Sequence, residues 1–572
     1  MYLRETRRRN RDGSTVSYLQ LAHNVRHPES GSPVAQVIHK FGRADRVDRE
    51  GLRRLVASIS RFLEPADTAG TVGGEVELVD ARRFGGAWML DELWQRLGIG
   101  AALVAAARGR RLDAEATERV LFALVANRAL EPSSKLAATR WVAERVAIPS
   151  CPTFDDDAAY AAMDFLLDGL GEIAEGIFSR VANLLNLACD VIFVDTTSTY
   201  FEVDVADAEI ELAHAQAQTA ETGEVAGGPV ELAGRRFSKH SKDQRADRPQ
   251  VVIAMAVTAE GIPIRCWCFP GDASDQLVIR RIRDDLAGWM LHRVIWVADS
   301  GFSSAANRAY LSHGGGSWVL AEKLRRTNTE ARAALARPGR YRPVAGNLRV
   351  KEVRVGQGAR SQRFVVCHNP EAATRDAQVR ANIVAYLTHR IAGSDHWSRP
   401  RRDELVGELR ATPALARFVR RTPAGKLRVD QAAIATDAHL DGKWLLRTAD
   451  ETLTPTDLAV AYKQLHHVER GWRDLKGALR LRPVFHWRED RVRSHIQLCW
   501  LALLLIRVVE NATGDTWRNV RHELDRMHLV TLHTDHGRVA QRTVTTARQR
   551  ELLAALELRE PPQFLDFELP SP

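Results

Sequence analysis

Two short apolar segments that each end in an aspartate constrain the fold of this chain more than any other feature. CDVIFVD ends at Asp195, and VIWVAD ends at Asp299. Short apolar runs rich in β-branched residues are typical of central strands in a sheet. Because the carboxyl ends of adjacent parallel strands open onto the same crevice, we expect the two carboxylates to lie close together. Either aspartate alone could equally be a helix cap.

The segments around these strands predict a mixed α/β core. QVVIAMAV and IPIRCWCF flank Glu260-Gly261 and have the pattern of a β-hairpin. A helix is expected over 275–290, where Ser274 or Asp275 of the GDASD segment would cap it, and another over 303–313 before the strand SWVLAEKL. The predicted order is therefore three strands, a helix, a strand, a helix and a strand.

At 572 residues the chain is too long for one ordinary core. Two strands and a helix over 48–62 are expected near the N-terminus, followed by a Pro- and Gly-rich linker at 64–75. An inserted loop is expected at 203–234. The predicted domains are an N-terminal β-containing basic region (1–63), a helical domain that is either DNA-binding or a scaffold (80–188), the α/β core (189–326 with 451–512), a β-rich insertion (327–450) and a C-terminal region (513–572).

The charge and the cysteines restrict the class of protein only loosely. The chain has 81 Lys and Arg against 72 Asp and Glu, a net charge of +9 that permits a nucleic-acid partner without requiring one. None of the six cysteines forms a CxxC pair, which favours a reducing cytoplasm. The longest apolar run, 498–509, is interrupted by Arg507 and is shorter than the roughly 20 residues of a membrane span, so a buried helix is expected.

The segment YKQLHHVERGWRDLK, residues 462–476, predicts one helix with two different stripes. One stripe is apolar and should face the core: Leu465, Val468, Trp472, Leu475 and Leu479. The other has the same spacing, rotated by roughly 100°: Tyr462, His466, Glu469, Arg473, Lys476 and Arg480. Glu469 is the only acid in that second stripe.

A single carboxylate among cations suits a metal ligand held next to a phosphate backbone, although a solvated helix face with ion pairs is the competing interpretation. Two aspartates and a glutamate supply the oxygen ligands that Mg²⁺ or Mn²⁺ prefers, and two such ions could support in-line phosphoryl transfer. The basic segment RRFSKHSKDQRADR, with Lys239 and Lys242, is a second candidate for backbone contacts or else a solvated loop. HHVE lacks the spacing of a zinc motif.

Together these blocks resemble the DDE transposases of bacterial insertion sequences, which have an RNase H-like catalytic fold. Asp195 in VIFVDTTS and Asp299 in VADSGF resemble the first two family blocks. Tyr462, Glu469 and Lys476 fit the signature Y-x2-R-x3-E-x6-K of one subgroup, whereas Leu465 stands at its arginine position. The resemblance covers about 190–510.

The resemblance implies that Asp195, Asp299 and Glu469 bind two Mg²⁺ ions, with Mn²⁺ as an alternative, and catalyse the reaction. It implies cutting of the element ends, joining of 3′ ends to target DNA, and phosphate contacts by Tyr462 and Lys476. The implied partners are double-stranded DNA with terminal inverted repeats and a second copy of the chain in a synaptic homodimer, without a membrane, in the bacterial cytoplasm or on the nucleoid. A catalytically inactive or domesticated DNA-binding protein and a two-metal nuclease are the alternatives.

Overall fold

The computed structural model describes residues 1–10, 15–27, 32–60, 76–187, 189–207, 234–238, 241–289, 294–324, 328–344, 346–482, 484, 486, 488–534 and 537–568. The linker expected at 64–75 and most of the loop expected at 203–234 lie outside these ranges. The chain divides into two compact units. The larger contains 82–529 and 542–562, and the smaller contains 1–81, 530–541 and 563–572.

The larger unit is built on one nine-stranded sheet. Five of its strands come from the predicted core, in the order β7 (Pro263–Pro270), β6 (Gln250–Val257), β5 (Val191–Tyr200), β8 (Ile295–Ala298) and β9 (Ser317–Glu322). β5, β8 and β9 are parallel to one another. β6 is antiparallel to both of its neighbours, β5 and β7. Helices α10 (Asp275–Asp285) and α11 (Ala305–Ser312) lie between the parallel strands in sequence. The predicted order of elements is confirmed, and the core is RNase H-like.

The insertion extends the same sheet beyond β9. Its strands follow in the order β15 (Lys443–Thr448), β12 (Gln362–His368), β11 (Arg349–Val355) and β10 (Arg342–Pro343). Besides these strands it contains a short hairpin, β13 (Val419–Arg421) and β14 (Leu427–Val429), and the helices α12 (Thr329–Ala336), α13 (Pro370–Ile391), α14 (Arg399–Ala411), α15 (Pro413–Ala416) and α16 (Gln431–Ala438). Leu387, Leu405 and Phe418 form part of a separate small apolar cluster there.

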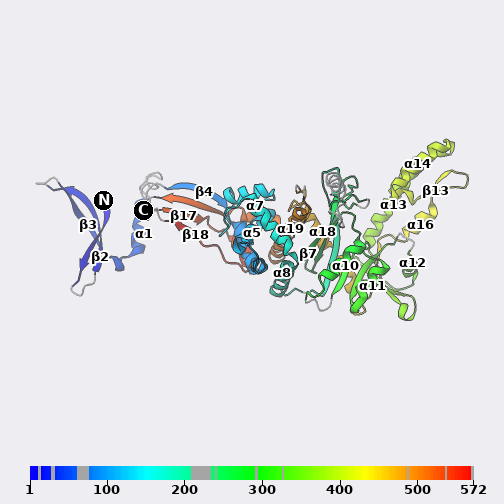
Figure 1. Cartoon of the computed structure of the whole chain (residues 1–572), viewed down its shortest axis with the longest axis horizontal. Helices are drawn as coiled ribbons and strands as arrows, with labels where there is room; N and C mark the ends of the chain where they lie inside the picture. The colour runs from blue at the N-terminus through cyan, green and yellow to red at the C-terminus, as the bar shows by residue number, and fades with distance from the viewer. Residues whose placement is uncertain are drawn as a thin grey trace, which may run out of the picture. The chain divides into compact units, whose positions relative to one another are not determined.

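Helices α3 (Gly85–Arg96), α5 (Ala114–Leu130) and α7 (Asp156–Asp168) pack against one long apolar helix, α19 (Glu489–Thr513), and α5, α7 and α19 lie together in Figure 1. Helices α4 (Ile99–Ala107), α6 (Lys135–Glu144) and α8 (Leu170–Leu184) pack against members of this group. Among the described residues, α19 alone is long and apolar enough to cross a membrane, but 94% of its most apolar window is buried within the protein. It is the buried helix that the sequence predicts.

The smaller unit contains one antiparallel three-stranded sheet and most of a second, four-stranded sheet. β1 (Tyr2–Arg9), β2 (Thr15–Arg26) and β3 (Pro33–Arg43) form one sheet, followed by α1 (Arg49–Ser60). The second sheet has the order β18 (Phe564–Glu568), β17 (Gly537–Arg542), β16 (His528–Thr534) and β4 (Glu77–Arg83). Helices α20 (Trp517–Leu524) and α21 (Ala547–Ala555) belong to the larger unit. The basic opening residues form a strand that the sequence pattern did not predict.

The prediction of one continuous helix over 462–476 is wrong. The chain forms α17 (Pro455–Lys463) and α18 (His466–Lys476), separated by Gln464 and Leu465. Backbone bonds of the tighter i→i−3 type, such as Leu465 N to Tyr462 O at 3.1 Å and Val468 N to Leu465 O at 3.0 Å, replace part of the α-helical ladder at the junction. The predicted apolar stripe is nevertheless buried at all five positions.

Candidate active site

The first two acids are brought together by strand register. β5 and β8 pair in parallel, and the last paired residues are Val194 and Ala298. Asp195 and Asp299 are the next residues on the two chains, and adjacent strands are roughly 4.8 Å apart. Burial raises the pKa of Asp195, and the charge of Asp299 raises it further, against the opposing effect of Lys242. The charge of Asp299 therefore acts on the Asp195 carboxyl, in agreement with the expectation that the two side chains lie close together.

Asp195 is held from two sides. Trp472, on the buried face of α18, donates from Nε1 to Asp195 Oδ2 at 3.2 Å. The ammonium of Lys242 lies 3.8 Å from Asp195 Oδ1. Helix α18 therefore fixes the orientation of this carboxylate through its apolar stripe, and a cation balances part of the carboxylate's charge.

Tyr462, at the end of α17, connects the aspartates to the third acid. Its hydroxyl donates to Asp299 Oδ1 at 3.3 Å. Burial raises the pKa of Tyr462 far above its usual value, and the charges of Asp299, Glu469 and Asp195 raise it further. Because all three carboxylates act on this phenol, it stays protonated and serves as a hydrogen-bond donor among them.

Glu469 lies on the exposed side of α18. Within the described ranges, no three His, Cys, Asp or Glu side chains are close enough together to hold one metal ion. The carboxylate donors suit a hard divalent cation chemically. In this geometry Asp195 and Asp299 are neighbours by strand register, and Tyr462, which is hydrogen-bonded to Asp299, lies within the electrostatic influence of Glu469.

A fourth carboxylate, Asp275, lies beside this group, although the sequence favoured a helix cap over a metal ligand at this position. Its Oδ1 accepts a hydrogen bond from Thr196 Oγ1 at 2.6 Å and lies 3.6 Å from Lys242 Nζ. A Cβ on Gly301 would come within 2.4 Å of Asp275 Oδ2, so the glycine leaves room for this carboxylate next to Asp299. The GDASD segment stood out in the sequence, but only the folded chain shows that Asp275 contacts Thr196, the residue that follows Asp195 in β5.

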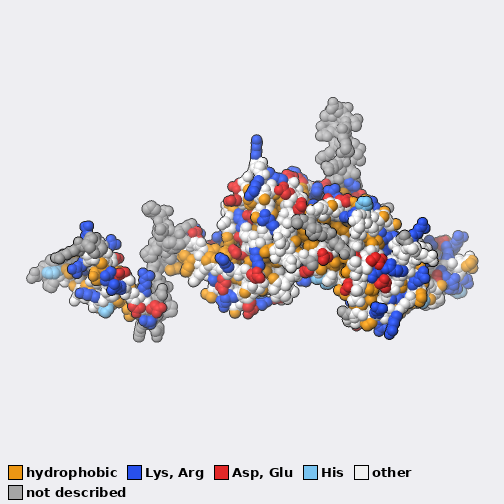
Figure 2. Space-filling view, turned by 90° about the horizontal axis from the view of Figure 1, so that it is seen from below, with side chains coloured by type: hydrophobic (Ala, Val, Ile, Leu, Met, Phe, Trp, Pro, Cys, Tyr) orange, Lys and Arg blue, Asp and Glu red, His pale blue; other side chains and the backbone are white. Residues whose placement is uncertain are grey.

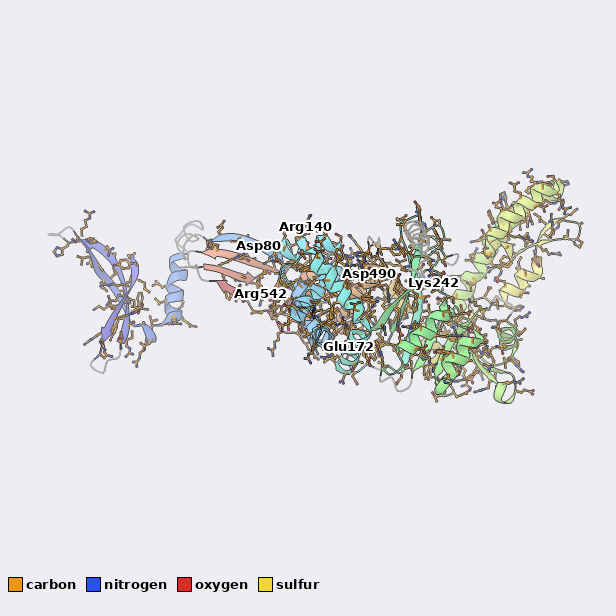
Figure 3. All side chains as sticks on the ribbon, in the orientation of Figure 1. Asp80, Arg140, Glu172, Lys242, Asp490 and Arg542 are labelled. Atoms are coloured by element: carbon orange, nitrogen blue, oxygen red, sulfur yellow. The ribbon has the colours of Figure 1, made fainter. Side chains whose placement is uncertain are left out.

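The predicted DNA-binding cations fall into two groups. Lys242 donates to Thr196 O at 2.8 Å, and Lys476 donates to Asp243 Oδ1 at 2.7 Å, so both are engaged within the protein. Arg473 and Arg480 are exposed. Lys239 lies outside the described residues. Lys242 is labelled in Figure 3, and in Figure 2 basic and acidic side chains are intermingled over the visible face.

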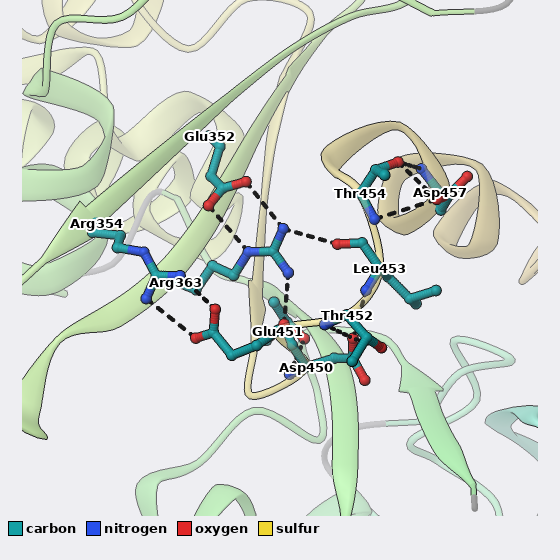
Figure 4. Close-up of polar contacts among 10 residues, drawn as sticks. Glu352, Arg354, Arg363, Asp450, Glu451, Thr452, Leu453, Thr454 and Asp457 are labelled. Carbon is teal, nitrogen blue, oxygen red and sulfur yellow. Dashed lines mark hydrogen bonds and ion pairs between the residues drawn. The ribbon is translucent and has the colours of Figure 1, made fainter.

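A buried arginine of the insertion positions the helix that carries Tyr462 (Figure 4). Arg363 on β12 donates to Asp450 O at 2.6 Å and to Leu453 O at 2.9 Å, and it pairs with Glu352 at 3.0 Å. Thr454 and Asp457 then form a capping box that begins α17. The insertion therefore contributes to the active site by fixing the loop before α17.

Comparison of the sequence with known protein families identifies the family of this chain. Residues 214–505, more than half of the chain, match the transposase DDE domain. This chain belongs to the DDE transposases. Residues 3–69 also match the N-terminal domain of the IS1634 family transposases. The resemblance inferred from the sequence is confirmed, whereas the signature around Glu469 stays a prediction.

The transposase has no match among curated proteins. One solved structure similar to it is described as the cryo-EM structure of a piggyBac transposase synaptic complex with hairpin DNA. The similarity has a TM-score of 0.32 at 9% sequence identity, over 77% of this chain and 79% of that chain. By its two matched family domains the protein is a DNA transposase, an enzyme whose DDE domain implies dependence on a divalent metal.

Proposed function

We propose that the transposase cuts both ends of its element by hydrolysis and joins the 3′ ends to target DNA, with Asp195, Asp299 and Glu469 as metal ligands. The observation that carries this proposal is the register that places Asp195 beside Asp299, with Tyr462 next to both. The exposed position of Glu469 on α18 leaves its carboxylate accessible from the side on which Arg473 also stands.

Two Mg²⁺ ions, or Mn²⁺ in their place, would activate the attacking hydroxyl and neutralise the leaving oxygen when bound. The chain's own residues prepare that site. Trp472 fixes one carboxylate oxygen of Asp195 and Tyr462 fixes one of Asp299, which leaves the other oxygens for ligation. Lys242 lies close to both Asp195 and Asp275 and offsets part of their negative charge.

DNA contacts are proposed for Tyr462, Arg473, Lys476, Arg480, Lys239 and Lys242. The exposure of Arg473 and Arg480 supports direct phosphate contacts by these two. Lys476 and Lys242 are already paired with aspartates, so phosphate would compete with Asp243 or Asp195 for them.

The proposed partners are the terminal inverted repeats, target DNA and a second copy of the chain in a synaptic homodimer. The basic N-terminal region is proposed to recognise the ends, the insertion to help hold them, and the helices of 80–188 to bind DNA or support the core. The proposed location is the bacterial cytoplasm, with nucleoid association when bound to DNA.

Cleavage of a labelled terminal-repeat duplex in Mg²⁺ tests this function. Glu469→Gln should lower cutting by at least about 100-fold, because it removes a ligand charge, while gel-shift affinity for the duplex is retained. Glu404→Gln, on an exposed face of α14, is the matched control and should cut normally. Normal cutting by Glu469→Gln would exclude Glu469 as a ligand, and binding without cutting by the wild type would favour a catalytically inactive protein.

A further inference from the structure

A cationic cavity lies away from the three acids, where the α5–α6 turn faces the segment between α18 and α19. Its volume is about 470 Å³. The basic and aromatic side chains that line it are Arg128, Lys135, Tyr160, Arg480, His486 and His495. They come from four separate parts of the larger unit, so the cavity exists only in the folded chain.

Three of these basic groups are deeply buried. Arg128 is 5% exposed, Lys135 is 3% exposed and His495 is 4% exposed. Lys135 Nζ lies 3.3 Å from His495 Nδ1, and Arg128 Nη1 makes only a long bond of 3.5 Å to Arg480 O. Arg128 Nε has no hydrogen-bond partner among the described residues. Arg128 and Lys135 are therefore poorly satisfied by the protein itself, whereas His495 also has its Nε2 at 3.3 Å from Leu481 O.

Carboxylates do not compensate for the buried charge. Within the described part of the chain, neither Arg128 nor Lys135 nor Arg480 forms an ion pair with an acid. The acid that acts on His486, Asp490, receives a hydrogen bond from Arg488 Nε at 3.1 Å (Asp490 is labelled in Figure 3). An arginine stays charged even when buried, and a buried charge without a counter-charge is costly.

The electrostatics of the cavity favour an anion. Burial and, to a smaller extent, the neighbouring cations lower the pKa of Lys135 to about 7 and that of His486 to about 4. A bound anion would reverse these effects by supplying the missing counter-charge. The first turn of α6, which begins at Lys135, also lies at the cavity and adds backbone donors at its positive end.

We propose that this cavity binds a phosphate group of the DNA substrate. Arg480 follows Lys476 by four residues on the segment that leaves α18, so the cavity adjoins the catalytic helix. The volume is large enough for a phosphate with part of its nucleotide. The identification of DNA as the source rests on the proposed function, whereas the affinity for phosphate does not.

Thermal unfolding of the full chain in phosphate or in chloride, at matched ionic strength and without divalent metal, tests the site. Phosphate should raise the Tm of the wild type, and Lys135→Gln and Arg128→Gln should each lose most of that rise. Lys351→Gln is the matched control, because Lys351 is also buried but donates to Arg337 O at 2.7 Å. It should lower the Tm in both buffers and keep the difference between them. An equal Tm of the wild type in the two buffers overturns the proposal.

Metal-free binding of a terminal-repeat duplex distinguishes DNA from free phosphate. Lys135→Gln should weaken this binding by roughly tenfold, the loss expected for one buried charged contact, while Lys351→Gln binds as the wild type does. A phosphate-dependent Tm with unchanged DNA affinity in Lys135→Gln would overturn the assignment to DNA. If the wild type does not cut DNA but both effects of Lys135→Gln are seen, the cavity assignment stands and the proposed cleavage fails.

Discussion

At the scale of single residues, Trp472 of α18 both packs in the core and contacts the candidate active site. Its ring is 6% exposed in the core, and its Nε1 donates to Asp195 Oδ2. A hydrogen bond to a charged group contributes about 1.5–3 kcal/mol, and it also fixes which way the carboxylate points. The residue was predicted as core, and its second role follows from the sheet that it packs against.

Replacing Trp472 with Phe keeps most of the packing and removes this donor. We expect a loss of about 1–3 kcal/mol in the free energy of unfolding and a slower cleavage rate, because Asp195 loses its orientation. Trp444→Phe is the control, since Trp444 Nε1 is buried without a partner among the described residues and its removal should cost little. Urea unfolding and cleavage kinetics measure both effects; equal losses in the two variants would assign Trp472 to packing alone.

Lys135 gives a prediction for pH. Burial lowers its pKa from 10.5 to about 7 in the folded chain. Between these values the unfolded chain holds a proton that the folded chain has released, so the free energy of unfolding rises with pH, by about 1.4 kcal/mol per pH unit. Lys135→Met should lack this contribution. Urea unfolding in chloride at pH 7, 8 and 9 compares the two slopes, and parallel slopes would contradict a depressed pKa.

At the scale of elements, the sequence predicted the core strands better than the side chains and segments that pack around them. An apolar run followed by an aspartate is a local pattern, and it marked where β5 and β8 stop pairing. It did not show that β5 continues past Asp195 to Tyr200 beside β6, so the predicted end of that strand is wrong. The positions of Asp275 and Lys242 were not readable, because they depend on how loops pack over the sheet. For the same reason, the attachment of β15 to β9 and the tight turn at Gln464 were not predicted: both are set by tertiary contacts.

Arg363 tests whether the insertion supports the active site. Arg363→Met would leave two backbone carbonyls and Glu352 without their donor, which should cost about 2–4 kcal/mol in unfolding free energy and slow cleavage by loosening the start of α17. Arg354→Met is the control on the neighbouring strand, because its pair with Glu451 is exposed and contributes at most about 1 kcal/mol. Chemical unfolding and cleavage rates measure the two effects. A destabilised Arg363→Met variant that cleaves at the normal rate would show that Arg363 supports folding and not the active site.

At the scale of the whole molecule, the two compact units allow recognition and catalysis to be tested separately. β1 belongs to the smaller unit, and its Arg7, Arg8 and Arg9 are exposed. The three acids and the cationic cavity belong to the larger unit. Changes to the arginines of β1 should therefore alter DNA binding without changing the fold or the phosphate response of the larger unit.

Replacing Arg7, Arg8 and Arg9 together with Gln should weaken binding to a terminal-repeat duplex. Each lost phosphate contact should lower the slope of log affinity against log salt by about 0.9, so the slope should fall by up to about 2.7 if all three bind phosphate. Arg140→Gln, Arg180→Gln and Arg559→Gln combined form the control, because these arginines are equally exposed but belong to the larger unit. Affinities measured over a salt series give the slopes. An unchanged slope in the β1 variant would remove the N-terminal region from end recognition and leave that role to the larger unit.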